Sequence, residues 1–505
     1  MAKGKAKKEK PEKVSKEAKK IKKKKGKKVQ TDEAEDDESP RGDTKFDLRA
    51  ALNGTLDDIA KKMSDADTLD DMPPMSTGSL ILNLVTGGIR AAWYTNFGPE
   101  QSAKTTGALT VLAAAIKAAI PLLALRDFEG STGNSIPYVT AIMNTNGVKI
   151  TKDELFGKKD DKTGKWIVPP RVRYSASTRG VGFFNWFAAV LRRMPDKKML
   201  ERKWWLVYED TKENAHLKEF ADSSMPRKYG KGIYIEAPDD KLQGVILLDS
   251  YPNMNPDYKD EDESDNSLAL QARMFSKNLP RVKGYLASKK VAVIGVNQLR
   301  DVPMAMYGPK EQEPCGKAIR YNSDVRVRWY PRSLNSAPLW PTAAKKGGKE
   351  VEPSLQGGKD YYKYIHISGA KNKLAVADRE GWIRLWTKDA EGKAHGIDPV
   401  FDTIYYLWLT GQVVPEGRGK KRSQLRLIFK GQKSKVIDWM VLKQMVLGDK
   451  KDMIAACKKA GVKPFDLRKA CFKQWESGEG EKLYSAQEKI GDASKPDTDD
   501  DGDDD

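Results

Sequence analysis

The sequence has few of the residues that build metal centres, disulfide frameworks or histidine-based catalytic triads. The three histidines are His216, His366 and His395, and the three cysteines are Cys315, Cys457 and Cys471. The cysteines lie far apart and match neither a zinc-binding nor a disulfide spacing. We therefore expect neither a zinc site nor a histidine-based triad.

Long apolar runs are also missing. Hydrophobic residues make up 39% and charged residues 32% of the 505-residue chain. No stretch reaches the ~18 apolar residues of a membrane span, and the N-terminal residues lack the apolar centre of a secretory signal. The sequence predicts an intracellular protein without a membrane anchor, long enough for about two or three domains.

Acidic residues are outnumbered, with 71 Asp and Glu against 90 Lys and Arg and a formal net charge of +19. This excess favours a polyanionic partner, with nucleic acid as the leading candidate. Much of it lies in residues 1–30, which are rich in lysine and too poor in apolar residues to fold. This tail would add non-specific, salt-sensitive nucleic-acid affinity, or serve as a localisation signal or solubility device. Residues 32–38 and 497–505 are acidic.

The most informative stretch is residues 97–106, which read FGPEQSAKTT and approach the phosphate-loop pattern G-x-x-x-x-G-K-[ST]. In such a loop, backbone N–H groups surround a phosphate, the lysine reaches the outer phosphates and the next hydroxyl holds Mg²⁺. Lys104 and Thr105 take the last two roles. Residues 91–97 predict a strand before the loop, and residues 109–120 predict a helix after it.

One position of this motif departs from the pattern, because Ala103 stands where a second glycine is expected. If the backbone there has a positive φ, the Cβ costs about 1–2 kcal/mol. The alternative is a chance Lys-Thr pair after a proline turn. The predicted nucleotide-binding residues of the loop are Gly98, Pro99, Glu100, Gln101, Ser102, Ala103, Lys104, Thr105 and Thr106.

Further along, residues 244–249 form an apolar run that ends in Asp249. A buried strand ending in aspartate is the usual form of the second magnesium-holding element in phosphate-loop enzymes. Thr105 and Asp249 are therefore the predicted metal-binding residues. Apolar runs ending in aspartate are common in other α/β proteins. The metal-binding role of Asp249 is therefore inferred from the position of its run downstream of the loop.

Preceded by STGSL at residues 76–80, the loop resembles that of RecA-type recombinases, a family that includes bacterial RecA and phage UvsX-like proteins. The resemblance covers about residues 46–410, broken by insertions, and indicates a divergent relative, for which a phage origin is one interpretation of the divergence. It implies an α/β, RecA-like phosphate-loop ATPase core with a twisted, largely parallel sheet, an N-terminal helix and a small C-terminal domain.

The resemblance also assigns roles around the nucleotide. Glu129, after the apolar run 122–127, would position the attacking water, and Gln298, at the end of the run 291–298, would sense the terminal phosphate. Tyr138 would stack on adenine. Lys371 and Lys373 would reach the ATP of a neighbouring subunit, comparable to an arginine finger.

Residues 306–326 resemble the second DNA-binding loop of the family. We expect a flexible loop in which aromatic and cationic side chains offer stacking and phosphate neutralisation; an ordinary surface loop is the alternative. The first DNA loop would lie near residues 260–266, which are acidic here, before a helix, and Cys315 replaces an expected glycine. The predicted DNA-binding residues are Arg273, Ser276, Arg300, Tyr307, Gly316, Lys317 and Arg320.

The expected organisation has five parts: a disordered tail at 1–45, a helical segment at 46–75 that packs on its own core or on a neighbouring subunit, the core at 76–395, a C-terminal domain at 396–480 and an acidic tail at 481–505. Insertions in the core are expected near 151–170, 197–240 and 331–360, the first two as hairpins. Residues 436–445, 452–459 and 464–475 predict helices with exposed Lys and Arg.

Together with these residues, the resemblance implies a DNA-dependent ATPase that uses ATP and Mg²⁺ and forms homo-oligomeric filaments on single-stranded DNA. It would pair them with double-stranded DNA for strand exchange in recombination and repair. Single-strand-binding and mediator proteins are candidate partners, without membrane contact. We expect it in the cytoplasm at the nucleoid, or in the host cytoplasm or a phage replication compartment if phage-encoded. The alternatives are a hexameric helicase with a RecA-like core and a non-hydrolysing DNA-coating filament protein.

Overall fold

A computed structural model of the chain describes residues 72–130, 136–194, 204–208, 233–236, 241–256, 267–301, 311–332, 344–346, 349–351, 361–388, 396–416 and 424–493. The predicted disordered tail at 1–45, the helix expected within 46–71, the acidic residues 260–266 and 497–505, and Tyr307 lie outside the described residues. None of the described helices combines the length and apolar character needed to span a membrane.

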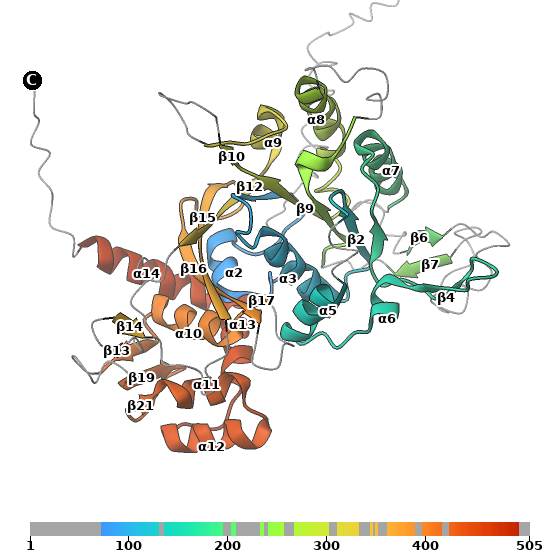
Figure 1. Cartoon of the computed structure of the whole chain (residues 1–505). Coiled ribbons are helices and arrows are strands. Elements are labelled where there is room, and N and C mark those ends of the chain that lie inside the picture. Colours follow the sequence, from blue (N-terminus) through green and yellow to red (C-terminus); the bar gives the residue numbers. More distant parts are fainter. Residues whose placement is uncertain are drawn as a thin grey trace, which may run out of the picture. The chain divides into compact units, whose positions relative to one another are not determined.

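The fold is built around a nine-stranded mixed sheet with the order β17-β16-β15-β12-β1-β9-β8-β2-β5 (Figure 1). Six neighbouring strands run parallel: β12 (Val325–Arg332), β1 (Trp93–Gly98), β9 (Val291–Gln298), β8 (Gly244–Asp249), β2 (Leu122–Asp127) and β5 (Arg173–Ser175). Three antiparallel strands extend one side: β15 (Tyr361–Asn372), β16 (Glu380–Lys388) and β17 (Gly396–Ile397). The predicted α/β class with a largely parallel sheet is confirmed.

Both faces of this sheet are buried, as the near-continuous apolar strands require. Along β8, Val245 and Leu247 belong to one apolar core, whereas Ile246 and Leu248 belong to the other. Helices α2 (Leu80–Thr86), α3 (Lys104–Lys117) and α5 (Ile136–Thr145) contribute to the first core. Helices α7 (Gly180–Arg193) and α8 (Ser267–Lys283) contribute to the second. The sheet therefore lies between two layers of helices (Figure 1).

Small antiparallel hairpins occupy the expected insertions. Strands β3 (Lys158–Lys159) and β4 (Trp166–Val168) pair after helix α6 (Lys152–Phe156), and β6 (Trp204–Tyr208) pairs with β7 (Ile233–Glu236). Antiparallel strand pairs therefore lie in both segments where hairpins were predicted, and their origin as insertions stays a prediction. A third pair, β13 (Ala344–Lys346) with β14 (Lys349–Val351), lies in the last insertion.

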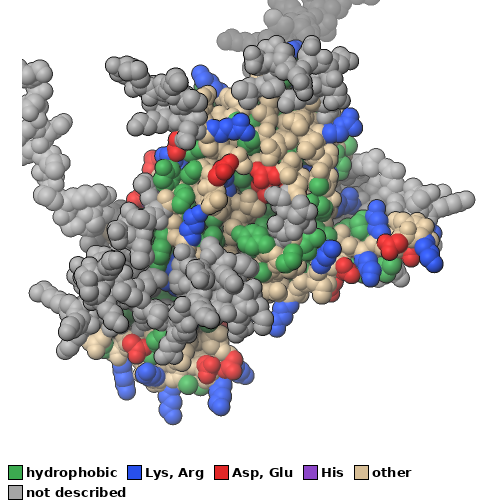
Figure 2. Space-filling model, in the orientation of Figure 1, with side chains coloured by type: hydrophobic (Ala, Val, Ile, Leu, Met, Phe, Trp, Pro, Cys, Tyr) green, Lys and Arg blue, Asp and Glu red, His purple; other side chains and the backbone are tan. Residues whose placement is uncertain are grey.

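The C-terminal region combines helices with a small antiparallel sheet. Its elements are α10 (Pro399–Leu409), β18 (Val413–Pro415), β19 (Gln424–Phe429), β20 (Gln432–Lys433), β21 (Ile437–Asp438), α11 (Trp439–Leu447), α12 (Lys450–Ala460), α13 (Leu467–Glu476) and α14 (Glu479–Ala493). Lysines 450, 451, 458 and 459 of α12 are exposed, and Figure 2 shows cationic side chains projecting where α12 lies in Figure 1. Helix α14 occupies the first part of the expected 481–505 tail, where Glu481 pairs with buried Arg379 at 2.6 Å.

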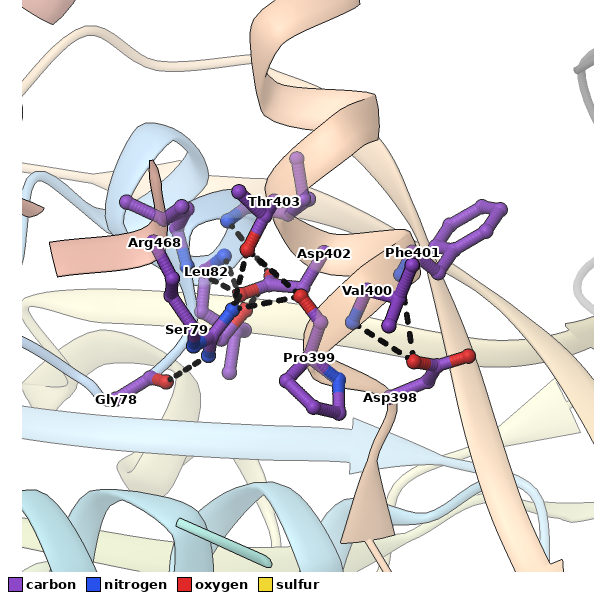
Figure 3. A network of polar contacts seen from close by, with 12 residues as sticks. Gly78, Ser79, Leu82, Asp398, Pro399, Val400, Phe401, Asp402, Thr403 and Arg468 are labelled. Atoms are coloured by element: carbon purple, nitrogen blue, oxygen red, sulfur yellow. Dashed lines mark hydrogen bonds and ion pairs between the residues drawn. The ribbon is translucent and has the colours of Figure 1, made fainter. Parts of the chain in front are cut away.

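A buried polar network joins this C-terminal region to the start of the core (Figure 3). The Asp402 carboxylate, 1% exposed, accepts hydrogen bonds from Ser79 Oγ and from the backbone N–H groups of Leu80 and Ile81. Arg468 donates to Asp402 at 2.9 Å and to the Gly78 carbonyl at 3.1 Å. A carboxylate at a helix N-terminus also opposes the positive end of the helix dipole, so the network fixes the beginning of α2.

Candidate nucleotide-binding site

The phosphate loop, residues 98–105, connects the carboxyl end of β1 to the N-terminus of α3, as the sequence predicted. Glycine is required at its start, because a Cβ on Gly98 would lie 2.0 Å from the Trp329 carbonyl oxygen of β12. Gly107, in the first turns of α3, would place a Cβ 2.2 Å from the Trp329 ring. The loop and the start of α3 therefore pack directly against Trp329 of the neighbouring strand β12.

Two non-glycine residues of the loop adopt left-handed backbone conformations. Ala103 has φ 64° and ψ 20°, and Gln101 has φ 54°. The condition set by the sequence is thus met: the position of the missing glycine has a positive φ, and its Cβ costs about 1–2 kcal/mol. The loop therefore carries local backbone strain at Ala103.

The Lys104 ammonium group lies inside the loop. Its Nζ donates to the Gly98 carbonyl at 2.9 Å and to Ser102 Oγ at 3.1 Å, and it also contacts the Pro99 carbonyl. Burial lowers the pKa of Lys104 to about 8, although nearby carboxylates, Asp249 first among them, act in the opposite direction. A phosphate replacing these loop acceptors would restore the charged form.

Thr105 and Asp249 meet at the carboxyl edge of the parallel strands. Thr105 Oγ1 lies 3.2 Å from each carboxylate oxygen of Asp249, which ends β8. A hydroxyl and a carboxylate are hard oxygen ligands of the kind that Mg²⁺ takes together with phosphate oxygens. This pair therefore fits the metal role expected for it.

Glu129 and Gln298 are also brought together, from β2 and β9 on either side of β8. Glu129 Oε1 accepts a hydrogen bond from Gln298 Nε2 at 2.9 Å and another from Ser250 Oγ. Gln298 is the register partner of Gly98, so this pair lies beside the start of the phosphate loop. A carboxylate and an amide thus lie together beside the start of the loop, and their water-positioning and phosphate-sensing roles stay predictions.

Behind this pair lies a charged network that the sequence interpretation missed. Asn297 Nδ2 donates to Glu313 Oε2 at 3.0 Å, Arg326 is ion-paired with Glu313 Oε1, and Arg320 Nε lies 3.8 Å from the same oxygen. The Glu313 and Arg326 side chains are each 8% exposed, and burial lowers the pKa of Arg326. An arginine between Val325 and Val327 on a buried strand signalled that a counter-charge was needed.

The second half of the predicted DNA loop is helical rather than a flexible loop, because Lys317–Asn322 form a helix, α9. Its DNA-binding role stays a prediction. The helix forms because Ile319 is buried against α8 residues. The Asn322 and Ser323 side chains also donate to the Ala318 and Ile319 carbonyls. Before it, Cys315 has φ 69°, which explains why glycine is expected there. Arg320 and Tyr321 are exposed on this helix.

The other predicted DNA residues lie on separate elements. Arg273 and Ser276 are exposed on α8, where Ser276 Oγ donates to the Ala272 carbonyl at 2.9 Å. Arg300 is exposed at the start of β10 (Arg300–Asp301), which pairs with β11 (Glu311–Gln312). Gly316 precedes α9 with φ 75°.

Tyr138, the predicted adenine-stacking residue, lies on α5. Its hydroxyl is hydrogen-bonded to Thr106 Oγ1, and burial raises the pKa of Tyr138. The contact links α5 to the first turn of α3 beside the phosphate loop.

Lys371 and Lys373 lie away from their own phosphate loop. Lys371 pairs in register with Arg326 of β12, and the Lys373 N–H donates to the Asp324 carbonyl just before β12 begins. Strand β12 runs parallel to β1, whose carboxyl end carries the loop, so these lysines lie toward the opposite edge of the sheet. Lys371 Nζ donates to the Arg320 and Tyr321 carbonyls at 3.0 and 3.1 Å.

Comparison with known proteins shows similarity to RecA proteins. Residues 240–334 match the model of the RecA N-terminal domain. The chain is 27% identical over 184 residues to the RecA protein of Thermus thermophilus, covering 36% of this chain and 47% of that protein. It is 34% identical over 132 residues to RecA of Symbiobacterium thermophilum, covering 26% of this chain and 32% of that protein. The chain thus spans less than half the length of these relatives.

The matched family region contains Asp249, Gln298 and Glu313, whereas the phosphate loop precedes it. A phosphate loop at the carboxyl end of a central parallel strand, with carboxylates ending the neighbouring strands, defines a phosphate-loop α/β protein with a RecA-like core. Within that class, the matches to the RecA N-terminal domain and to RecA proteins, at low identity and over part of the chain, support a divergent RecA-type protein.

Proposed function

We propose that this protein is an ATP-dependent recombinase that assembles on single-stranded DNA and pairs it with homologous duplex DNA. The observation that carries the proposal is the continuous polar connection from the phosphate loop to α9. It runs from the Glu129–Gln298 pair through the adjacent Asn297 to Glu313, and from Glu313 to Arg320. An isolated nucleotide-binding domain needs no such connection to an exposed cationic helix.

In the proposed reaction, the phosphate loop and Lys104 bind the outer phosphates of ATP. Thr105 and Asp249 would hold Mg²⁺, which would supply charge neutralisation for the bound phosphates. Glu129 orients a water molecule and accepts its proton as the water oxygen bonds to the γ-phosphorus and the bond to the ADP oxygen breaks. Gln298, hydrogen-bonded to Glu129, is placed to respond to the presence of the terminal phosphate.

DNA would act through the other end of this connection. A phosphate bound by Arg320 competes with Glu313 for the guanidinium group, because both are anions. Glu313 would then shift its contact with Asn297, which is the neighbour of Gln298. This gives a physical route by which DNA on α9 changes the position of the water-orienting pair.

Filament assembly would complete the site. Lys371 and Lys373 lie toward the sheet edge opposite their own phosphate loop. Lys371 would exchange its contacts with the Arg320 and Tyr321 carbonyls for a neighbour's nucleotide. Cations donated in trans stabilise the charge that develops on the transferred phosphoryl group. Hydrolysis would therefore depend on assembly.

A non-hydrolysing DNA-coating filament is the second candidate, favoured by one observation. The strained Ala103 backbone, with φ 64°, could misalign the loop N–H groups and leave binding without efficient turnover. The test is ATP hydrolysis with and without single-stranded DNA, combined with electron microscopy in the presence of an ATP analogue. DNA-stimulated hydrolysis that Lys104→Ala abolishes supports the recombinase, whereas nucleotide-independent filaments without hydrolysis support the coat.

A further inference from the structure

A second lysine contacts the phosphate loop from a different part of the fold. Lys363 lies near the beginning of β15, two strands away from β1 in the sheet order. Its Nζ donates to the Gln101 carbonyl at 2.5 Å. The accepting residue is one of the two that hold a left-handed backbone in the loop, with φ 54°.

This contact follows from the strand register. Tyr364 pairs with Arg332, and Arg332 lies four residues beyond Arg328, the partner of Phe97 on β1. The start of β15 is therefore at the carboxyl edge of the parallel strands, where the loop begins. Lys371 is eight residues further along the same strand, about 26 Å away at the usual rise per residue. One strand thus carries a cation to each edge of the sheet.

Lys104 contacts the Gly98 carbonyl and Ser102 Oγ of the loop, whereas Lys363 contacts the Gln101 carbonyl. The positive charge of Lys363 is close enough to contribute to the lowered pKa of Lys104, although burial is the larger cause. Two cations that disfavour each other are both stabilised when a multiply charged anion binds between them. The ammonium group has three donors, so contact with the Gln101 carbonyl is compatible with contact to a phosphate oxygen.

We propose that Lys363 and the Gln101 segment of the loop form a subsite for the terminal phosphate of a nucleoside triphosphate bound in the same chain. The subsite rests on the proposed nucleotide-binding function and adds a cis-acting cation to it. Lys363 would bind the terminal phosphate and also hold the strained Gln101 peptide, so that the following N–H groups point toward the phosphates.

The first test compares affinities for a non-hydrolysable ATP analogue and for ADP, with Mg²⁺ and without DNA. Lys363→Met keeps the apolar stem and removes the charge. We expect the affinity for the triphosphate analogue to fall by about tenfold and the affinity for ADP by about twofold. Lys363→Arg should recover most of the loss. Lys433→Ala, which removes an exposed lysine of β20, serves as the control, and thermal melting checks that each variant is folded.

Equal losses for both nucleotides would overturn the phosphate contact and leave only a loop-holding role. Unchanged affinities in folded Lys363→Met protein would overturn the subsite altogether. If the unaltered protein binds neither nucleotide, the proposed function fails first, and that result is distinct from a selective loss in the variant.

A mixing experiment tests whether Lys363 acts in cis. Lys363→Met and Lys104→Ala damage the same site when both residues serve one chain, so every subunit in a mixed filament has a defective site. We expect ATP hydrolysis on single-stranded DNA no higher than the sum of the two parents. Recovery above that sum would place Lys363 at the neighbour's nucleotide and overturn the proposal.

Discussion

Gln298 donates a hydrogen bond from its side-chain Nε2 to Glu129 Oε1 over 2.9 Å, joining two strands that lie on either side of β8. The bond fixes the carboxylate in one orientation relative to Asp249 at the end of β8. It also makes the position of Glu129 depend on a residue whose neighbour, Asn297, contacts Glu313.

Replacing Glu129 should separate nucleotide binding from hydrolysis. Glu129→Gln keeps the size of the side chain and removes the proton acceptor, so we expect hydrolysis to fall about 100-fold or more while nucleotide affinity changes little. Steady-state hydrolysis and equilibrium binding measure the two effects. Gln312→Ala, at an exposed position of β11, is the control. Full hydrolytic activity in Glu129→Gln would mean that another group orients the attacking water.

Nucleotide binding should depend on pH through Lys104. The free ammonium has a pKa of about 8 because it is buried, and bound phosphate favours the charged form and raises that pKa. Binding above about pH 8 therefore takes up a proton, and affinity should fall by up to about tenfold per pH unit. Titration calorimetry in buffers of different ionisation enthalpy measures the uptake. A Lys104→Met variant should bind weakly and show no such proton uptake.

The two late lysines of β15 should act only in trans. Lys371→Ala with Lys373→Ala should leave nucleotide affinity of the free subunit nearly unchanged. Hydrolysis in the filament should fall by about 1,000-fold or less, since lysine is a weaker partner than an arginine finger. Mixing this double variant with Lys104→Ala should restore part of the activity, because a Lys104→Ala subunit can donate its lysines to an intact loop. No recovery in filaments shown to contain both variants would contradict the trans assignment.

Restoring the missing glycine should stabilise the loop. Ala103 has φ 64°, so Ala103→Gly removes about 1–2 kcal/mol of backbone strain from the folded state. Glycine also gives the unfolded chain more conformational freedom, which offsets part of this stabilisation. We expect the free energy of unfolding to rise by about 0.5–1 kcal/mol. Ala114→Gly, inside α3, is the matched control and should lower it by about 1 kcal/mol. Chemical denaturation measures the free energy of unfolding of both variants. A decrease for Ala103→Gly would contradict the inferred backbone strain.

Removing Glu313 should disturb both stability and DNA response. Glu313→Gln leaves buried Arg326 without its ion-pair partner, which costs about 3–5 kcal/mol in typical buried pairs. DNA stimulation of hydrolysis should also weaken, since the connection between Asn297 and Arg320 is cut. Arg320→Ala keeps the buried pair and should lose the DNA response with little loss of stability. Unchanged DNA stimulation in both variants would remove Glu313 from the coupling route.

The parts that could be predicted from the sequence are those fixed by local order. Lys104 and Thr105 are consecutive in a motif, and Asp249 ends a buried strand, so their meeting follows from the rule that parallel strands end at one edge. Lys363 and Glu313 could not be found in this way, because each reaches its partner through sheet order and strand register. Helix α9 was missed because its stability depends on Ile319 packing against α8.

The Asp402 network limits when the start of α2 can reach its final contacts during synthesis. Ser79 and Leu80 begin the helix before the phosphate loop, but the carboxylate that they bind is 322 residues away from Leu80 in the sequence. That carboxylate is buried, and its cationic partner, Arg468, comes a further 66 residues later. Because the N-terminal part leaves the ribosome first, residues 79–80 cannot complete this network until Arg468 has been synthesised. A truncation before residue 468 would leave a buried charge in the core, so shortened forms should be cut after α13.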